Sequence, residues 1–279
     1  MVEPGVLLGV GSAAAWGAGD FSGGVAARRV GGMLVTGGAQ VVGFLILLAA
    51  VAVLRPPAPG LDTIVLGALG GGAGGLGLAA LYRGLALGAM GLVSAVSGVG
   101  GVLVPLAVGV LLWGTPIQPL QLVGVGCALA AVAFASGATT RGVNREALLL
   151  ALAAALGFGL WFVFLNRAAE HDQLWALVAS RGSASLLVGG AALLRSDRSN
   201  LRQVAPLIGI AGLMDVGANG MVVLSFATIP VGIAAALSGT YPLATMLLAR
   251  FVLGEALPRL GLAAVGLAVA GIVFISLGG

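Results

Sequence analysis

The chain has 279 residues, of which 59% are hydrophobic and 8% are charged, and its formal net charge is +4. Soluble domains carry about 25% charged residues, so this composition and a mean hydropathy of +1.15 exclude a soluble globular protein. All 13 basic residues are arginines and most lie between apolar blocks, which indicates membrane orientation and argues against nucleic-acid binding.

The apolar residues fall into ten blocks of about twenty residues, the length with which a helix crosses about 30 Å of hydrocarbon. No block alternates apolar and polar residues as a barrel strand would. The predicted fold class is an all-α, polytopic membrane protein with ten transmembrane helices. The predicted spans are 6–26, 33–54, 62–82, 91–113, 118–137, 146–166, 174–194, 204–227, 231–252 and 258–277.

The first predicted span contains a carboxylate. In the stretch WGAGDFSGG, residues 16–24, Asp20 lies in an otherwise apolar block. An ionised acid inside a bilayer is costly unless it faces a cavity or a partner, so we interpret Asp20 as functional. Trp16 precedes Asp20 by one helical turn and therefore shares its helix face.

The next three spans add neutral polar groups. Gln40 lies within the second span, and Tyr82 near the end of the third, where it could close a cavity. Glycines repeat every four residues within 67–88, which is typical of close helix packing and not of a nucleotide site. In the fourth span, Pro105 follows Ser97 and is a predicted hinge, because proline removes a backbone donor and kinks a helix.

The second half brings the remaining intramembrane charges. Trp161 lies in the sixth span, Arg181 is the only arginine well inside a span, and Asp215 and Asn219 lie one turn apart in the eighth. A buried unpaired charge is expensive, so we expect Arg181 to form a salt bridge with Asp215 or Asp20. The alternative is that Arg181 anchors a substrate carboxylate.

The sequence repeats itself after 141 residues. Residues 91–98 (GLVSAVSG) fall on residues 232–239 (GIAAALSG), and the same shift places Gln40 on Arg181. After a one-residue slip, VGCALAAVAFAS (125–136) falls on VGLAVAGIVFIS (265–276). We therefore predict a duplicated five-span unit, with one copy over 1–138 and the other over 139–279.

Because five is odd, the second copy would cross the membrane in the opposite orientation. Such inverted repeats are typical of secondary transporters, whose site lies between the halves near the bilayer midplane. We predict alternating access through a central cavity, with Asp20 and Asp215 as coupling candidates and Pro105 and Pro242 as hinges. The predicted substrate-binding residues are Trp16, Asp20, Gln40, Tyr82, Ser97, Trp161, Arg181, Asn219, Ser238 and Tyr241.

Several stretches resemble the drug/metabolite transporter superfamily, in particular its ten-span EamA-type branch. They are AAAWGAGDFSGGVAARR (13–29), ALYRGLALGAMG (80–91), SGTYPLATMLLARFVLGE (238–255) and the glycine-bearing last span. The GE at 254–255 is a frequent feature of the family, whereas the first half reads Gly114-Thr115. The resemblance implies a multi-pass protein of the bacterial inner membrane that moves small metabolites, amino acids or drugs, usually outward.

The arginines divide unevenly between the connections. Those on odd-numbered connections are Arg28, Arg29, Arg83, Arg141, Arg145, Arg195, Arg198, Arg202, Arg250 and Arg259, and those on even-numbered ones are Arg55 and Arg167. By the positive-inside rule the odd connections are cytoplasmic and both termini are outside. Members of the family are often described with both termini inside, so both orientations stay open.

An intramembrane aspartyl protease is the alternative function. Residues 17–20 read G-x-G-D, the motif of enzymes in which two carboxylates share a proton and activate water, and Asp215 is a second deep acid. As a family those enzymes pair the motif with an earlier acid and a later Pro-Ala-Leu, an order this chain does not follow. We therefore predict a non-enzyme without cofactor or metal, whose partners are a small-molecule substrate and the lipid bilayer, with no nucleic acid, as a monomer or homodimer.

Overall fold

Helices occupy nearly all of the chain that the computed structural model describes, which is residues 4–88, 90–114, 116–139, 144–170, 172–195, 200–225, 237–255 and 259–277. Outside the ninth predicted span, their ends fall within four residues of the predicted ones, because each apolar block is bounded by polar, glycine or proline residues. The helices are α1 (Pro4–Val30), α2 (Gly32–Leu54), α3 (Leu61–Ala86), α4 (Met90–Trp113), α5 (Pro119–Thr139), α6 (Arg145–Ala169), α7 (Gln173–Ala184), α8 (Gly190–Arg195), α9 (Leu201–Ser225), α11 (Tyr241–Leu253) and α12 (Arg259–Leu277).

Two predicted spans depart from a single α-helix. The seventh consists of α7, a π-helical turn η1 (Ser185–Gly189) and α8. The ninth, predicted over 231–252, starts outside the described residues and is interrupted at 239–240, so that α11 begins at Tyr241. Pro242 therefore lies in the first turn of a helix, where its missing N–H has no intrahelical partner to lose, whereas Pro105 lies inside α4.

Six helical segments in the described part of the chain are long and apolar enough to cross a membrane. They are Gly32–Leu54, Leu61–Ala86, Met90–Leu112, Arg145–Ala169, Gln173–Leu194 and Leu201–Val222. Large apolar side chains also remain exposed on the outer faces, among them Val53, Leu111, Leu194 and Phe251, and a bilayer would cover them. The chain is thus a multi-pass membrane protein, and the count of ten spans stays a prediction.

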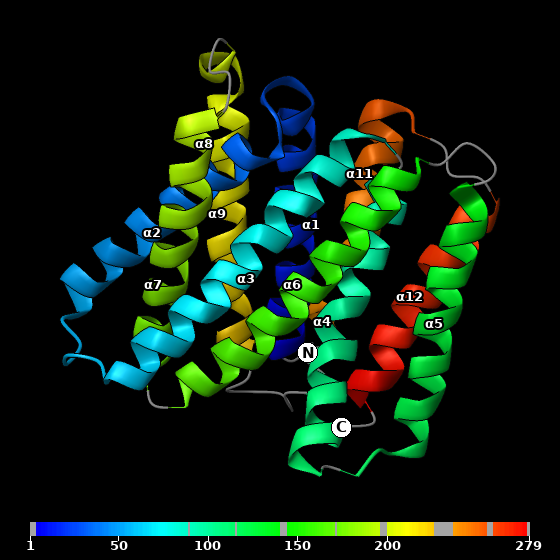
Figure 1. The fold of residues 1–279 in the computed structure, drawn as a ribbon, viewed down its shortest axis with the longest axis horizontal. Coiled ribbons are helices and arrows are strands. Elements are labelled where there is room, and N and C mark those ends of the chain that lie inside the picture. The colour runs from blue at the N-terminus through cyan, green and yellow to red at the C-terminus, as the bar shows by residue number, and fades with distance from the viewer. Residues whose placement is uncertain are drawn as a thin grey trace.

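The helices of the two halves pack across each other (Figure 1). α3 packs against α6 and α7, and α9 packs against α1 and α2. α4 contacts α6 while α11 contacts α1, and α5 runs beside α12. Each half therefore supplies helices that complete the other.

Two backbone approaches between these helices use equivalent positions. A β-carbon on Gly71 of α3 would overlap the carbonyl oxygen of Ser180 on α7. A β-carbon on Gly212 of α9 would lie 2.7 Å from the carbonyl oxygen of Ala39 on α2. Gly71 and Gly212 are 141 residues apart, as are Ala39 and Ser180, so the contact recurs with the halves exchanged.

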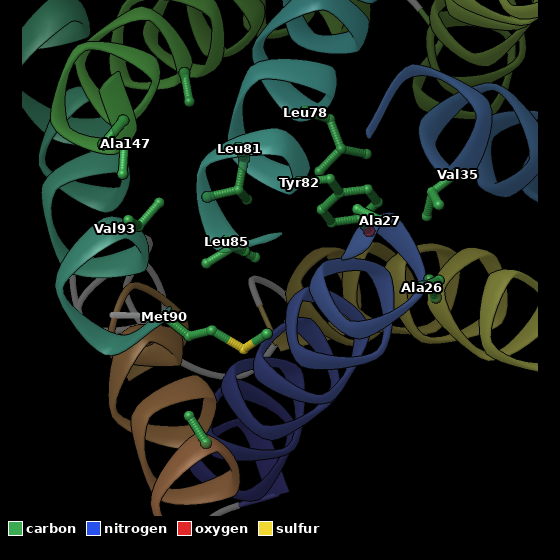
Figure 2. Packing of buried hydrophobic residues seen from close by; sticks show 14 of the residues in the cluster. Ala26, Ala27, Val35, Leu78, Leu81, Tyr82, Leu85, Met90, Val93 and Ala147 are labelled. Atoms are coloured by element: carbon green, nitrogen blue, oxygen red, sulfur yellow. The ribbon is translucent and has the colours of Figure 1, made fainter. Parts of the chain in front are cut away.

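The largest buried apolar cluster gathers where α1 and α3 end and where α4 and α6 begin. We call this region the packed end; it includes Ala26, Ala27, Leu81, Tyr82, Leu85, Met90, Val93 and Ala147. Figure 2 shows Tyr82 of α3 lying against the turn of α1 that carries Ala27, and Met90 reaching toward the same helix. At this end of the bundle the space between the helices is filled by side chains.

Candidate functional site

A cavity of about 420 Å³ lies between the halves and is lined by residues of α1, α2, α3, α4, α6, α7, α9, α11 and α12. Nine of the ten predicted binding residues line it, and so do Asp215 and Pro105. The nine are Trp16, Asp20, Gln40, Ser97, Trp161, Arg181, Asn219, Ser238 and Tyr241. The fold thus brings these side chains together, while their roles in binding stay predictions.

The cavity and the packed end lie at opposite ends of the helix bundle. On α1 the cavity residue Asp20 precedes Ala26 of the packed end, and on α9 Asp215 follows the core residue Ile208. The same order is found along α3, α4, α6 and α11. In each of these helices the cavity residues lie nearer the even-numbered connections, and the core residues lie nearer the odd-numbered ones. Side chains therefore fill the bundle at the end with the odd-numbered connections, and the cavity lies nearer the even-numbered connections.

Arg181 is held by two partners. Its Nη1 donates to the carboxylate of Asp215 and, over 2.8 Å, to Oε1 of Gln40. The Arg181 side chain is 7% exposed, so the pair is largely removed from water. Of the two salt-bridge partners expected from the sequence, the structure has Asp215, and the guanidinium is not free to serve as the only anchor of a substrate carboxylate.

Asp215 receives hydrogen bonds from three helices. Besides Arg181 of α7, Nε1 of Trp16 on α1 donates to Asp215 Oδ1 over 3.2 Å. Nδ2 of Asn219 donates to the Asp215 backbone oxygen over 2.8 Å and lies 3.5 Å from Oδ1. The negative charge of Asp215 is therefore both paired and solvated by protein donors.

Asp20 is in the opposite situation. It is 8% exposed and lines the same cavity. Among the residues that the structure describes, none donates a hydrogen bond to its carboxylate or forms an ion pair with it. A buried acid of this kind must be compensated by water, a proton or a cationic ligand, because its desolvation is otherwise uncompensated.

Aromatic rings form the remaining walls. The rings of Trp16 and Tyr241 meet edge to face with centroids 6.1 Å apart, and the Tyr241 hydroxyl lies above Gly98 of α4. On the other side Trp161 packs edge to face on Phe162, with centroids 4.8 Å apart, and its Nε1 donates to Ser180 Oγ over 3.0 Å. These contacts fix the indoles in defined positions.

Tyr82 does not line the cavity. Its ring lies against Gly23 of α1 within the packed end, where a β-carbon on Gly23 would overlap it. Sequence reasoning in turn missed Phe158 and the glycines Gly71, Gly74 and Gly75 as lining residues. The four-residue glycine spacing signalled close packing, but it did not indicate that Gly74 makes room for the indole of Trp161.

Glu255 joins three helices at the packed end. Its Oε1 accepts from Arg28 Nη2 of α1 over 3.0 Å, and its Oε2 accepts from the backbone N–H of Met90 at the start of α4 over 2.8 Å. Gly254, which ends α11 with φ of 68°, turns the chain so that Glu255 reaches both donors. The carboxylate thus caps α4 and ties it to α1 and α11.

Glu255→Ala should therefore lower the free energy of unfolding by about 2 kcal/mol, because a half-buried charged acceptor serving two donors is lost. Thermal unfolding of the purified protein in detergent measures the change. Glu146→Ala is the matched control, since its ion pair with Arg83 is exposed and should contribute below about 1 kcal/mol. Equal losses in the two variants would contradict the assigned role of Glu255.

The two acids are not arranged as a protease dyad. Such a dyad shares one proton between two neighbouring carboxylates. Here Asp215 is committed to Arg181, Trp16 and Asn219, while Asp20 stands without a hydrogen-bonding partner in the described ranges. Within the same ranges, no three histidine, cysteine, aspartate or glutamate side chains are grouped as a metal ion would require.

Comparison with known proteins places this arrangement in context. The model of the EamA-like transporter family matches residues 145–277. A solved crystal structure described only as "Crystal structure of protein" is 19% identical and has a TM-score of 0.61, over 99% of this chain and 97% of that one, which indicates a shared fold. No curated protein gives a significant match. The resemblance expected from the sequence is confirmed over the second half of the chain, where residues 145–277 match the model of the EamA-like transporter family.

Proposed function

We propose that the protein is a secondary transporter that exports a small organic solute through the cavity by alternating access. The observation that carries the proposal is the cavity itself, which lies between the halves and brings together Asp20, Arg181 and Asp215 from three of the apolar blocks. Ion-pair and aromatic contacts hold its walls, while one carboxylate, Asp20, is left for a ligand or a proton. Family members are transporters and not enzymes, which agrees with a role in transport.

The alternating-access part of the proposal rests on an inverted repeat of two five-span units, 1–138 and 139–279. The exchanged contact of Gly71 with Ser180 and of Gly212 with Ala39 supports it. Arg181 and Gln40, which are equivalent under the 141-residue shift, support it further because Arg181 donates a hydrogen bond to Gln40. Equivalent residues of two repeats can contact each other in this way only beside the twofold axis that relates them. Two equivalent halves allow two states of similar energy.

In the proposed topology the ten spans lie in the bacterial inner membrane with the arginine-rich odd connections in the cytoplasm. The packed end then faces the cytoplasm, and the cavity lies toward the opposite side. Glu255 would hold this state closed at the cytoplasmic side, and its contacts with Arg28 and Met90 would have to break when the transporter turns inward.

Asp20 is the proposed coupling residue. A buried carboxylate that alternately faces two compartments can take up a proton on one side and release it on the other. Asp215 is the weaker candidate, because its interaction with Arg181 would have to be broken in every cycle. In an antiport cycle, proton entry at Asp20 would drive solute in the opposite direction.

Proteoliposome flux tests the proposal. Vesicles with an acidic interior should accumulate amino acids or aromatic amines faster than vesicles without a pH gradient, because protons leaving through Asp20 drive uptake. Asp20→Asn should remove the stimulation, whereas Asp62→Asn should keep it, since Asp62 is an exposed acid in the first turn of α3. If Asp20→Asn leaves both flux and pH dependence unchanged, the coupling assignment fails; absence of flux for every solute would overturn the transport proposal.

A further inference from the structure

We infer that the cavity selects small monovalent organic cations that carry an aromatic or other flat apolar group, with Asp20 as their counter-ion. This inference rests on the proposed transport function and names the class of solute. Two features of the cavity support it: the net charge of its lining residues and the aromatic rings in its walls.

Among the described residues, three charged side chains line the cavity, namely Asp20, Arg181 and Asp215. Arg181 and Asp215 neutralise each other through their ion pair, so the ionised cavity carries one net negative charge, at Asp20. Since Asp20 has no hydrogen-bonding partner among the described residues, the missing compensation must come from what enters the cavity. An ammonium or other cationic group provides it.

A solute carboxylate finds no comparable partner. Among the described lining residues Arg181 is the only cation, and Asp215 and Gln40 already accept from it. An anion placed there would have to displace Asp215 from Arg181, leaving that acid with the hydrogen bonds of Trp16 and Asn219 alone. It would also meet the repulsion of Asp20. The site therefore disfavours anions, and it favours an amine over the corresponding amino acid.

The walls suit the apolar part of such a cation. Trp16 lies one turn from Asp20 on α1 and packs against Tyr241, so two ring systems stand near the acid. Trp161, Phe162 and Phe158 contribute further aromatic surface to the same cavity. Aromatic faces attract cations and stack on flat groups, and a desolvated site strengthens both effects. The cavity volume of about 420 Å³ accommodates a small solute of this kind.

A set of probes of similar size and different charge tests the inference. Phenethylammonium, 2-phenylethanol, 3-phenylpropionate and zwitterionic phenylalanine share one phenyl group, and calorimetric titration of the purified protein gives their affinities. We expect phenethylammonium to bind at least tenfold more tightly than the alcohol and phenylalanine, and the anion to bind weakest. The affinity for phenethylammonium should fall as the pH is lowered, because protons compete for Asp20.

Asp20→Asn should bring all four affinities within a few-fold of one another and remove the pH dependence. Asp20→Glu should retain the preference for the cation, which separates loss of charge from loss of fold, and Asp62→Asn should match the unchanged protein. Equal or tighter binding of the anion, or a cation preference that survives Asp20→Asn, would overturn the inference. Cation binding without flux would overturn the proposed transport instead, whereas Asp20-dependent flux of 3-phenylpropionate would preserve transport and overturn the cation site.

Discussion

Arg181→Ala should be among the most destabilising single substitutions in the protein, lowering the free energy of unfolding by about 3 kcal/mol or more. The substitution leaves Asp215, whose side chain is 20% exposed, without its counter-charge, and breaking a buried ion pair costs about 3–5 kcal/mol. It also removes the donor to Gln40, so one contact between α2 and α7 is lost. The loss of stability is measured by thermal unfolding in detergent, with tryptophan fluorescence as the signal.

A double-substitution cycle separates the ion pair from the packing of Arg181. Arg181→Met keeps an unbranched apolar side chain, and Asp215→Asn keeps the shape of the acid without its charge. Each alone should destabilise the protein, because each leaves the other charge in the wall of the cavity without its partner. The double variant should recover most of the loss, since no uncompensated charge remains. Additive losses would mean that the pair does not act as a unit.

Gly71→Ala should have the second large effect, again about 3 kcal/mol or more. A methyl group at this position overlaps a backbone carbonyl, that of Ser180, and a backbone cannot move aside as a side-chain end can. α3 and α7 would have to separate, and overpacking of this kind typically costs about 1–3 kcal/mol and sometimes more. The unfolding temperature in detergent should fall accordingly.

Gly217→Ala is the matched control for Gly71→Ala. Gly217 also lies within a helix, α9, but it is exposed and a β-carbon there would meet nothing within 4 Å. Alanine exceeds glycine in helix propensity by about 1 kcal/mol, so this variant should be as stable as the unchanged protein or more stable. If both variants lose stability equally, the cause is not the approach of α3 to α7.

The extents of the helices could be predicted because one physical quantity sets them. A segment crossing a bilayer needs about twenty apolar residues, and Arg55 or the polar stretch 166–173 ends such a segment visibly. The π-helical turn at 185–189 was not predictable, whereas the interruption at 239–240 lies at a glycine, directly before the helix turn that contains Pro242. The π-helical turn depends on how the helix fits its neighbours, and its stretch contains no residue that demands the observed backbone.

The members of the candidate site could largely be predicted for a similar reason. A polar group in an apolar span must face the protein interior, so Asp20, Gln40 and Arg181 had to converge. Which acid pairs with Arg181 depends on the packing of α7 against neighbouring helices, and the sequence left two possibilities. Tyr82 was assigned to the cavity because of its polarity, but its position is set by the flat surface that Gly23 offers to its ring.

The space that Gly74 leaves for the indole of Trp161 marks a difference between the two halves of the predicted repeat. Under the 141-residue shift, Gly74 corresponds to Asp215 and Trp161 corresponds to Asp20. Where one half sets an indole against a glycine, the other half therefore has two acids, one of which is balanced by Arg181. The predicted duplication therefore implies that both positions of this pair have changed in one copy or the other. A chain with Trp at position 20 and Gly at position 215 would have the same residue types at this pair in both halves, a cavity without Asp20, and an arginine without its acid.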